Sequence, residues 1–194
     1  MYVVAYTYSN ESGDEEFKRA AQTRANEIRN SKGFDPKKDT VLVAGVDSFA
    51  TFKDLVGKAN GLEKQFGKVG ELDIFSHAGR DGPNFQEGHN HGLVPPPYSN
   101  EQNRSGIEGL HVNWAPSAQA GFYGCNTANP YDDFAQVFAN KQNVSTYGIS
   151  TSASFSGYKD WGTIGHALFR LGVNTQNLYM VPQVRRDPQP KPKF

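Results

Sequence analysis

Segments typical of β-strands alternate with segments typical of helices along most of this chain, and this alternation constrains the fold more than any other feature. Short runs rich in β-branched and aromatic residues predict strands at 2–8, 40–46, 71–76, 118–124, 144–149 and 177–184. Apolar residues at helical spacing predict helices at 14–31, 48–66, 130–140 and 162–172. Such alternation is typical of βαβ units, whose strands form a mostly parallel sheet. The sequence therefore predicts an α/β fold, in which the near-continuous apolar run 40–46 is a strand buried on both faces.

The length of the chain and two irregular segments set the expected domain boundaries. With 194 residues, the chain is long enough for one domain with a substantial core. Residues 1–184 are expected to form that single domain. Residues 185–194 are rich in Pro and Lys and are predicted to be a disordered tail. Residues 78–109 show no periodic pattern, and so long a loop in a compact domain usually has a function.

The charge balance argues against two classes of partner. The chain has 20 Lys and Arg residues and 20 Asp and Glu residues, so its formal net charge is zero. Binding to the phosphates of nucleic acid or of a membrane surface needs a basic excess, and neither partner is expected. The first residues lack the pattern of a signal peptide, and no apolar run approaches the ~20 residues of a membrane span. We therefore expect synthesis in the cytoplasm, and any export would proceed without a cleaved signal peptide.

The single cysteine of the chain lies at the end of a predicted strand. Cys125 directly follows the strand 118–124, and His77 directly follows the strand 71–76. The carboxyl ends of parallel strands meet at one edge of a sheet, so the two side chains lie close together if these strands are neighbours. An ordinary thiol is mostly protonated at neutral pH, and an adjacent imidazole can remove its proton and make it a nucleophile. We therefore interpret His77 and Cys125 as a catalytic pair, since one cysteine permits neither an intramolecular disulfide nor a cysteine-only metal site.

Small residues flank both members of this pair. Ala78 and Gly79 follow His77, and Gly124 precedes Cys125. The glycines allow the backbone of a substrate to approach closely. The backbone amides around Gly79 and Cys125 are candidate donors to the oxyanion of an acyl-transfer reaction.

The motifs around the two residues resemble a known family. Residues 76–79 (Ser-His-Ala-Gly) follow one apolar strand, and residues 123–128 (Tyr-Gly-Cys-Asn-Thr-Ala) end a second. They are similar to the caspase-like superfamily (clan CD) of cysteine peptidases, especially to bacterial CHAT-type domains and the self-processing peptidase domains of large toxins. In these proteins a strand ends in His-Gly, and a later strand ends in Ala-Cys or Gly-Cys, often followed by Asn-Thr or Glu-Thr. The resemblance extends over about residues 40–157, and this chain departs from it at Ala78, which separates His77 from the glycine.

The resemblance implies a three-layer α/β sandwich of caspase-like type with the activity of a cysteine endopeptidase. His77 and Cys125 would form its catalytic dyad, and neither a cofactor nor a metal would be needed. The substrate would be a protein or peptide. The context would be a bacterial toxin or effector module, restrained by an inhibitory or immunity protein. Residues near the catalytic strands would bind the substrate, namely Arg80, Asp81, Thr151, Ser152, Ser154 and Phe155, with Asp132, Asp133 and Asp160 as further candidates for charge in the specificity pocket.

Two other interpretations stay open. In the first, the same fold is a binding module with a degenerate site, which the displaced glycine favours, and Cys125 reacts no faster than an ordinary thiol. In the second, His77, His89 and His91 bind zinc in a metal-dependent hydrolase. Such an enzyme would lose activity with a chelator and keep it after Cys125→Ala. Asp73, on the strand before His77, is expected to face solvent or a helix rather than to orient the imidazole.

Overall fold

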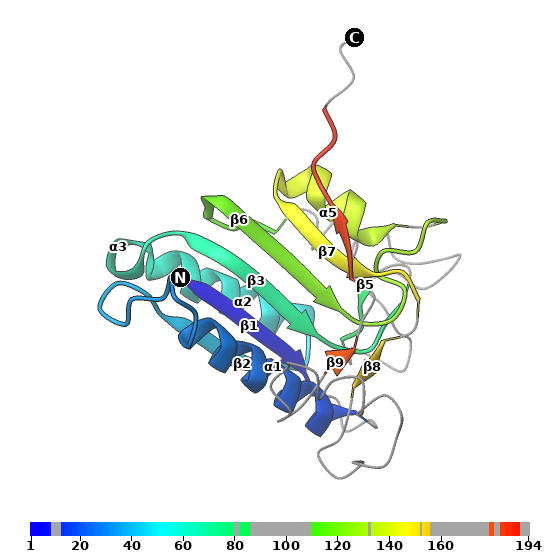
Figure 1. Ribbon diagram of the computed structural model, residues 1–194, viewed down its shortest axis with the longest axis horizontal. Helices are drawn as coiled ribbons and strands as arrows, with labels where there is room; N and C mark the ends of the chain where they lie inside the picture. Colours follow the sequence, from blue (N-terminus) through cyan, green and yellow to red (C-terminus); the bar gives the residue numbers. More distant parts are fainter. Residues whose placement is uncertain are drawn as a thin grey trace.

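A six-stranded sheet forms the centre of the protein (Figure 1). The computed structural model describes residues 1–8, 13–79, 82–85, 110–131, 133–151, 153–155, 179–180 and 183–190. The strand order is β10-β7-β6-β3-β1-β2. The strands are β1 (Tyr2–Thr7), β2 (Val41–Val46), β3 (Val69–Phe75), β6 (Trp114–Tyr123), β7 (Ser145–Ile149) and β10 (Gln183–Arg186). All neighbouring strands run parallel except β10, which is antiparallel to β7, so the predicted α/β fold with a mostly parallel sheet is confirmed.

The helices of the described residues lie where apolar periodicity predicts them, with shifted ends. They are α1 (Asp14–Arg29), α2 (Phe49–Gly61), the short α3 (Glu63–Phe66) and α5 (Phe134–Gln142). Two small antiparallel pairs complete the described elements, β4 (Ala78–Gly79) with β5 (Gly82–Pro83), and β8 (Ser154–Phe155) with β9 (Tyr179–Met180). The predicted helix at 162–172 lies outside the described residues. Within the described ranges, no helix has the length and apolar character needed to cross a membrane.

Local hydrogen bonds explain where the helices begin. Ser48 and Thr51 form a capping box before α2, in which each side chain accepts a hydrogen bond from the backbone N–H of the other residue. The side chain of Asp133 caps α5 by accepting a hydrogen bond from the N–H of Gln136 at 2.9 Å. This cap makes α5 begin at Phe134 rather than at the predicted position 130.

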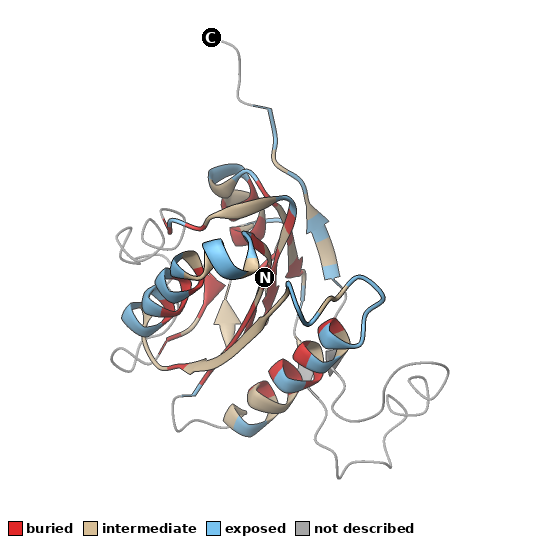
Figure 2. Cartoon of the chain, turned by 90° about the vertical axis from the view of Figure 1, so that its left-hand side faces the viewer, coloured by how far each residue is buried: buried red, intermediate tan, exposed pale blue. Residues whose placement is uncertain are grey.

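Helices cover both faces of the sheet, as in a three-layer sandwich. On one face, a buried cluster joins α1 to the strands, and it contains Phe17, Ala20, Ala21, Ile28, Val4, Phe75 and Tyr123. On the other face, a larger cluster joins α2 and α5 to the strands, and its bulky members include Phe52, Ile74, Phe122, Phe134 and Phe138. Figure 2 shows the buried sides of the helices turned toward the sheet and their exposed sides turned outward. We call the first of these faces the α1 face.

The chain changes its direction across the sheet at β1. It passes from β1 through α1 to β2 at the edge, returns through α2 to β3 on the other side of β1, and then continues to β6 and β7. In open α/β sheets, ligands bind at the carboxyl ends of the strands beside such a switch point. The switch point lies between β1 and β3, so a site is expected at the ends of these two strands, and β6 pairs with β3 on its other side.

The C-terminal segment differs from its prediction as a disordered tail. Arg185 and Arg186 belong to β10, so the sheet continues past the predicted boundary at 184. Beyond the strand, Gln136 donates to the carbonyl of Asp187 at 2.9 Å. The partners of this segment lie on α5 and β7, far away in the sequence, so the local Pro- and Lys-rich composition does not reveal them.

Candidate active site

His77 and Cys125 lie just beyond the ends of two neighbouring parallel strands. β3 pairs with β6, and Phe75 is opposite Tyr123 in the last pair of the register. The N–H of Ser76 donates to the carbonyl of Tyr123 at 3.3 Å, so the two segments stay paired one residue past the strands. His77 and Cys125 each come two residues after the last pair, and the register therefore places them at the same level of the sheet.

Gly124 packs directly against the segment that carries His77. A Cβ atom at Gly124 would be 2.5 Å from the Cβ of Ala78 and 2.7 Å from the carbonyl oxygen of Ser76. Real Cβ atoms do not approach other atoms so closely, so only glycine allows this contact. The backbone on both sides of His77 thus touches the backbone that leads into Cys125.

The imidazole of His77 lies on the α1 face of the sheet. Its ring meets the ring of Phe17 edge to face, with centroids 4.9 Å apart and an interplanar angle of 89°. Phe17 belongs to the buried cluster of Phe75 and Tyr123, whose rings stack with centroids 4.5 Å apart. Gly13, which precedes α1, has φ +110°, and a Cβ there would be 3.3 Å from Nε2 of His77. The half-buried imidazole therefore lies between the beginning of α1 and the end of β3.

The thiol of Cys125 is free and half-buried, and it contacts the segment after β7. Its Sγ accepts a hydrogen bond from the N–H of Ala153 at 3.3 Å. A hydrogen bond donated to sulfur stabilises negative charge that forms on it during reaction. The thiol is therefore partly accessible and has a donor in place.

The turn after Cys125 is fixed by hydrogen bonds to the end of β7. Asn126 adopts a left-handed conformation with φ 60°, which asparagine tolerates better than most residues. Its N–H donates to the carbonyl of Thr151 at 2.8 Å. The fully buried hydroxyl of Thr127 accepts from the N–H of Ile149 at 2.9 Å. These contacts hold an unfavourable backbone conformation next to the cysteine, which is common at functional sites.

The segment after His77 turns back on itself as a narrow hairpin. Ala78 and Gly79 form β4 and pair with β5. The N–H of Asn84 donates to the carbonyl of His77 at 2.8 Å and closes the hairpin. The residues predicted to supply oxyanion donors, Ala78, Gly79 and Gly124, therefore lie together beside His77 and Cys125.

The residues predicted to bind substrate are described only in part. Thr151 is exposed and follows β7, and its carbonyl supports the turn after Cys125. Ser154 and Phe155 form β8. The other predicted binding residues and the loop histidines lie outside the described residues, namely Arg80, Asp81, His89, His91, Asp132, Ser152 and Asp160. Within the described part of the chain, no three His, Cys, Asp or Glu side chains are grouped to hold a metal ion.

Asp73 faces helix α1, one of the two environments that the sequence predicts for it. Its Oδ2 accepts from Nε of Arg24 at 3.0 Å, and Nη2 of the same guanidinium donates to Oε1 of Glu71 at 2.7 Å. The amide of Gln119 donates to the other carboxylate oxygen of Glu71 at 2.7 Å. The side chains of Asp73 and Glu71 are 2% and 8% exposed. A Cβ at Gly121 would be 2.3 Å from Oδ1 of Asp73, so this glycine makes room for the buried carboxyl group.

We expect the buried pair of carboxyl groups to make stability depend on pH. Burial, followed by the nearby Glu71 carboxylate, raises the pKa of Asp73 well above its ordinary value of 3.8, and Arg24 opposes this shift. The folded protein therefore keeps a proton that the unfolded chain releases. The stabilisation from this proton is fully present below the pKa that Asp73 has in the unfolded chain. It is lost as the pH rises through the pKa of Asp73 in the folded protein.

Asp73→Asn removes this titration, so the free energy of unfolding should fall less with rising pH in the variant than in the wild type. Urea unfolding at intervals from about pH 4 to about pH 8 measures the difference between the two proteins, in which the titration of all other groups largely cancels. Parallel curves over this range would contradict the assignment.

Two residues of the site, Phe17 and Ala153, have no signal in the sequence that connects them with it. In the sequence, Phe17 is one of the apolar residues of the helix predicted at 14–31, and Ala153 lies in a Ser-rich segment. Neither carries a local signal, because the fold brings both to the site from distant segments. Thr127, by contrast, belongs to the motif around Cys125, and its buried hydroxyl supports the turn after the cysteine.

Comparisons of this chain with protein-family models, with curated proteins and with solved structures find no match. The interpretation of the site therefore depends on its own geometry and chemistry.

Proposed function

We propose that this chain is a caspase-like cysteine endopeptidase in which Cys125 is the nucleophile and His77 is the general base and acid. The observation that carries the proposal is the register of β3 and β6, which puts both residues two positions beyond the same pair of strand ends. The close contact of Gly124 with Ser76 and Ala78 supports it, because it leaves no space for a side chain between the two segments.

The proposed reaction is the hydrolysis of a peptide bond through a thioester. The imidazole accepts the thiol proton, the sulfur of Cys125 bonds to the carbonyl carbon, and the carbonyl oxygen takes the negative charge. Backbone amides near Gly79 and Cys125 donate hydrogen bonds to that oxygen. The C–N bond then breaks as His77 gives the proton to the leaving amine. Water, deprotonated by the same imidazole, then attacks the thioester carbon. The C–S bond breaks, and the imidazolium returns the proton to the sulfur, which releases the acid and restores the thiol.

The substrate class and the biological context follow from the resemblance to caspase-like peptidases. The substrate would be a protein or peptide, and no cofactor enters the reaction. A role as a bacterial toxin or effector module, held inactive by an inhibitory or immunity protein, is part of the proposal.

A binding module of the same architecture is the second candidate. Ala78 favours this candidate, because the caspase-like family usually has glycine at this position. The Cβ of Ala78 would also clash with any side chain at Gly124. Such a module needs the surface of the site but not a reactive thiol.

Trapping of the acyl-enzyme distinguishes these candidates. The protein is incubated with a mixture of peptide aminomethylcoumarin amides that vary the residue before the scissile bond, and it is then quenched in acid. Release of fluorophore, together with an acyl mass on the fragment that contains Cys125, is the expected result. Release that persists in Cys125→Ala and stops with a chelator would favour the metal-dependent hydrolase. The absence of both release and adduct would favour the binding module.

A further inference from the structure

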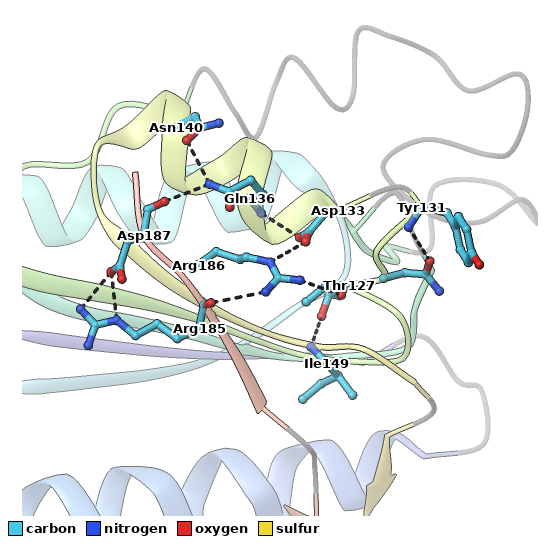
Figure 3. A network of polar contacts seen from close by, with 11 residues as sticks. Thr127, Tyr131, Asp133, Gln136, Asn140, Ile149, Arg185, Arg186 and Asp187 are labelled. Atoms are coloured by element: carbon cyan, nitrogen blue, oxygen red, sulfur yellow. Dashed lines mark hydrogen bonds and ion pairs between the residues drawn. The ribbon is translucent and has the colours of Figure 1, made fainter. Parts of the chain in front are cut away.

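The C-terminal strand is attached to the loop that follows Cys125. Nε of Arg186, in β10, pairs with Oδ2 of Asp133 at 2.5 Å, and its Nη2 lies 3.5 Å from the carbonyl oxygen of Ala128. The side chains of Arg186 and Asp133 are only 24% and 19% exposed. Figure 3 shows Arg186 pointing toward Asp133 at the beginning of α5. One guanidinium thus contacts the loop both near the cysteine and at its far end.

Asp133 binds Arg186 and also caps helix α5. Its Oδ1 caps α5 by accepting from the N–H of Gln136 at 2.9 Å, while its Oδ2 binds Arg186. Ala128 is fully buried, and its N–H donates to the carbonyl of Ile149 at 2.9 Å. The loop between Cys125 and α5 is therefore fixed by β7 on one side and by Arg186 on the other.

The conformation of this loop needs such support. Asn126 directly follows Cys125 and has φ 60°, a left-handed conformation that asparagine tolerates and that the contacts around the loop help to hold. If the loop is released, Asn126 can relax to a favourable backbone conformation. That change would move Sγ of Cys125 away from the N–H of Ala153, which donates to it.

Arg185 provides an internal comparison because it is the same residue type in the same strand but has different partners. Its guanidinium binds Asp187 at 2.9 Å and Ser145 at 3.2 Å, and its side chain is 57% exposed. Figure 3 shows it on the side of β10 away from Asp133. Its partners are Ser145 in β7 and Asp187 just after β10, and among the described residues it has no hydrogen bond or ion pair to the loop.

We propose that Arg186 is a positioning residue for Cys125: it holds the loop after the nucleophile and so makes the reactivity of the thiol depend on the docking of β10. This inference rests on the proposed function. If β10 is displaced from the sheet, this contact is lost and the activity at Cys125 falls.

The test compares Arg186→Met with Arg185→Met. The rate of alkylation of Cys125 by iodoacetamide is measured from about pH 6 to about pH 9 in the full chain, after circular dichroism has shown each variant to be folded. Arg186→Met should react about three- to tenfold more slowly than wild type near neutral pH, because a small displacement of a catalytic group is costly. Arg185→Met should stay within about twofold of wild type. Arg186→Lys, which keeps the charge, should recover part of the rate.

Asp133→Asn keeps the test informative if Arg186→Met fails to fold. Asparagine still caps α5 but lacks the charge that pairs with Arg186. It should slow alkylation in the same direction, and the double variant should be no slower than Arg186→Met. Equal rates for wild type, Arg186→Met and Asp133→Asn, or equal slowing by Arg185→Met, would overturn the inference.

His77→Ala separates a failure of this inference from a failure of the proposed function. If His77→Ala slows alkylation while Arg186→Met does not, the inference fails and the proposed function stands. If wild type and His77→Ala both react like free cysteine, the proposed function fails and the inference fails with it.

Discussion

Gly124→Ala is expected to lower the rate of peptide hydrolysis about a hundredfold, because a displacement of about 1 Å at a catalytic site has an effect of this size. The added Cβ would lie 2.5 Å from the Cβ of Ala78 and 2.7 Å from the carbonyl oxygen of Ser76. The carbonyl belongs to the backbone and cannot rotate away like the end of a side chain. The two segments must therefore separate, and His77 and Cys125 separate with them.

The same substitution should also cost stability. Overpacking a buried position typically destabilises a protein by about 1–3 kcal/mol. Gly57→Ala is the matched control, since a Cβ at this helical position meets no atom within 4 Å. It should leave hydrolysis unchanged and stability equal or slightly higher. Initial rates with the peptide library and urea unfolding measure both effects, and full activity in Gly124→Ala would contradict the close approach of the two segments.

Arg24→Met should lower the free energy of unfolding by about 3–5 kcal/mol, the usual loss when one partner is removed from a buried ion pair. Methionine can fill the space of the side chain but cannot pair with the carboxylates of Glu71 and Asp73. Both acids are buried against α1, so the charge of Glu71, and that of Asp73 once it ionises, would be left without compensation. The loss should grow with pH, because protonation relieves the uncompensated charge at low pH.

Arg29→Met provides the control on the same helix. Arg29 is exposed, and its hydrogen bonds to the described residues are long, 3.4 Å to the side chain of Asn26 and 3.5 Å to the carbonyl of Val41. Its replacement should change stability by no more than about 0.5 kcal/mol. Urea unfolding near pH 7.5 compares the two variants, and a loss below 1 kcal/mol in Arg24→Met would show that the network does not stabilise the fold as inferred.

The sequence predicts the element types well because each of them has a local signal. The period of the apolar residues separates strands from helices, and this was sufficient to place His77 and Cys125 at strand ends. The order of the strands has no such signal. The apolar run 40–46 was predicted to be buried on both faces, yet β2 lies at the edge of the sheet and is mostly half-buried.

The contacts that support the site could not be predicted from the sequence. Phe17, Ala153 and Arg186 reach the site from three separate segments, and none of them belongs to a motif. The alternation of Glu71, Asp73 and Phe75 indicates that they share one face of a strand, but it does not show that Arg24 covers the two acids. Such contacts arise only when the elements pack together.

The alkylation of Cys125 by iodoacetamide, measured against pH in wild type and in His77→Ala, tests the catalytic pair most directly. The account predicts that wild type reacts at least about tenfold faster than free cysteine between pH 6 and pH 7, because the imidazole of His77 accepts the thiol proton as the sulfur attacks. It also predicts that His77→Ala loses this advantage. Rates in both proteins that match free cysteine at every pH would contradict the proposed dyad.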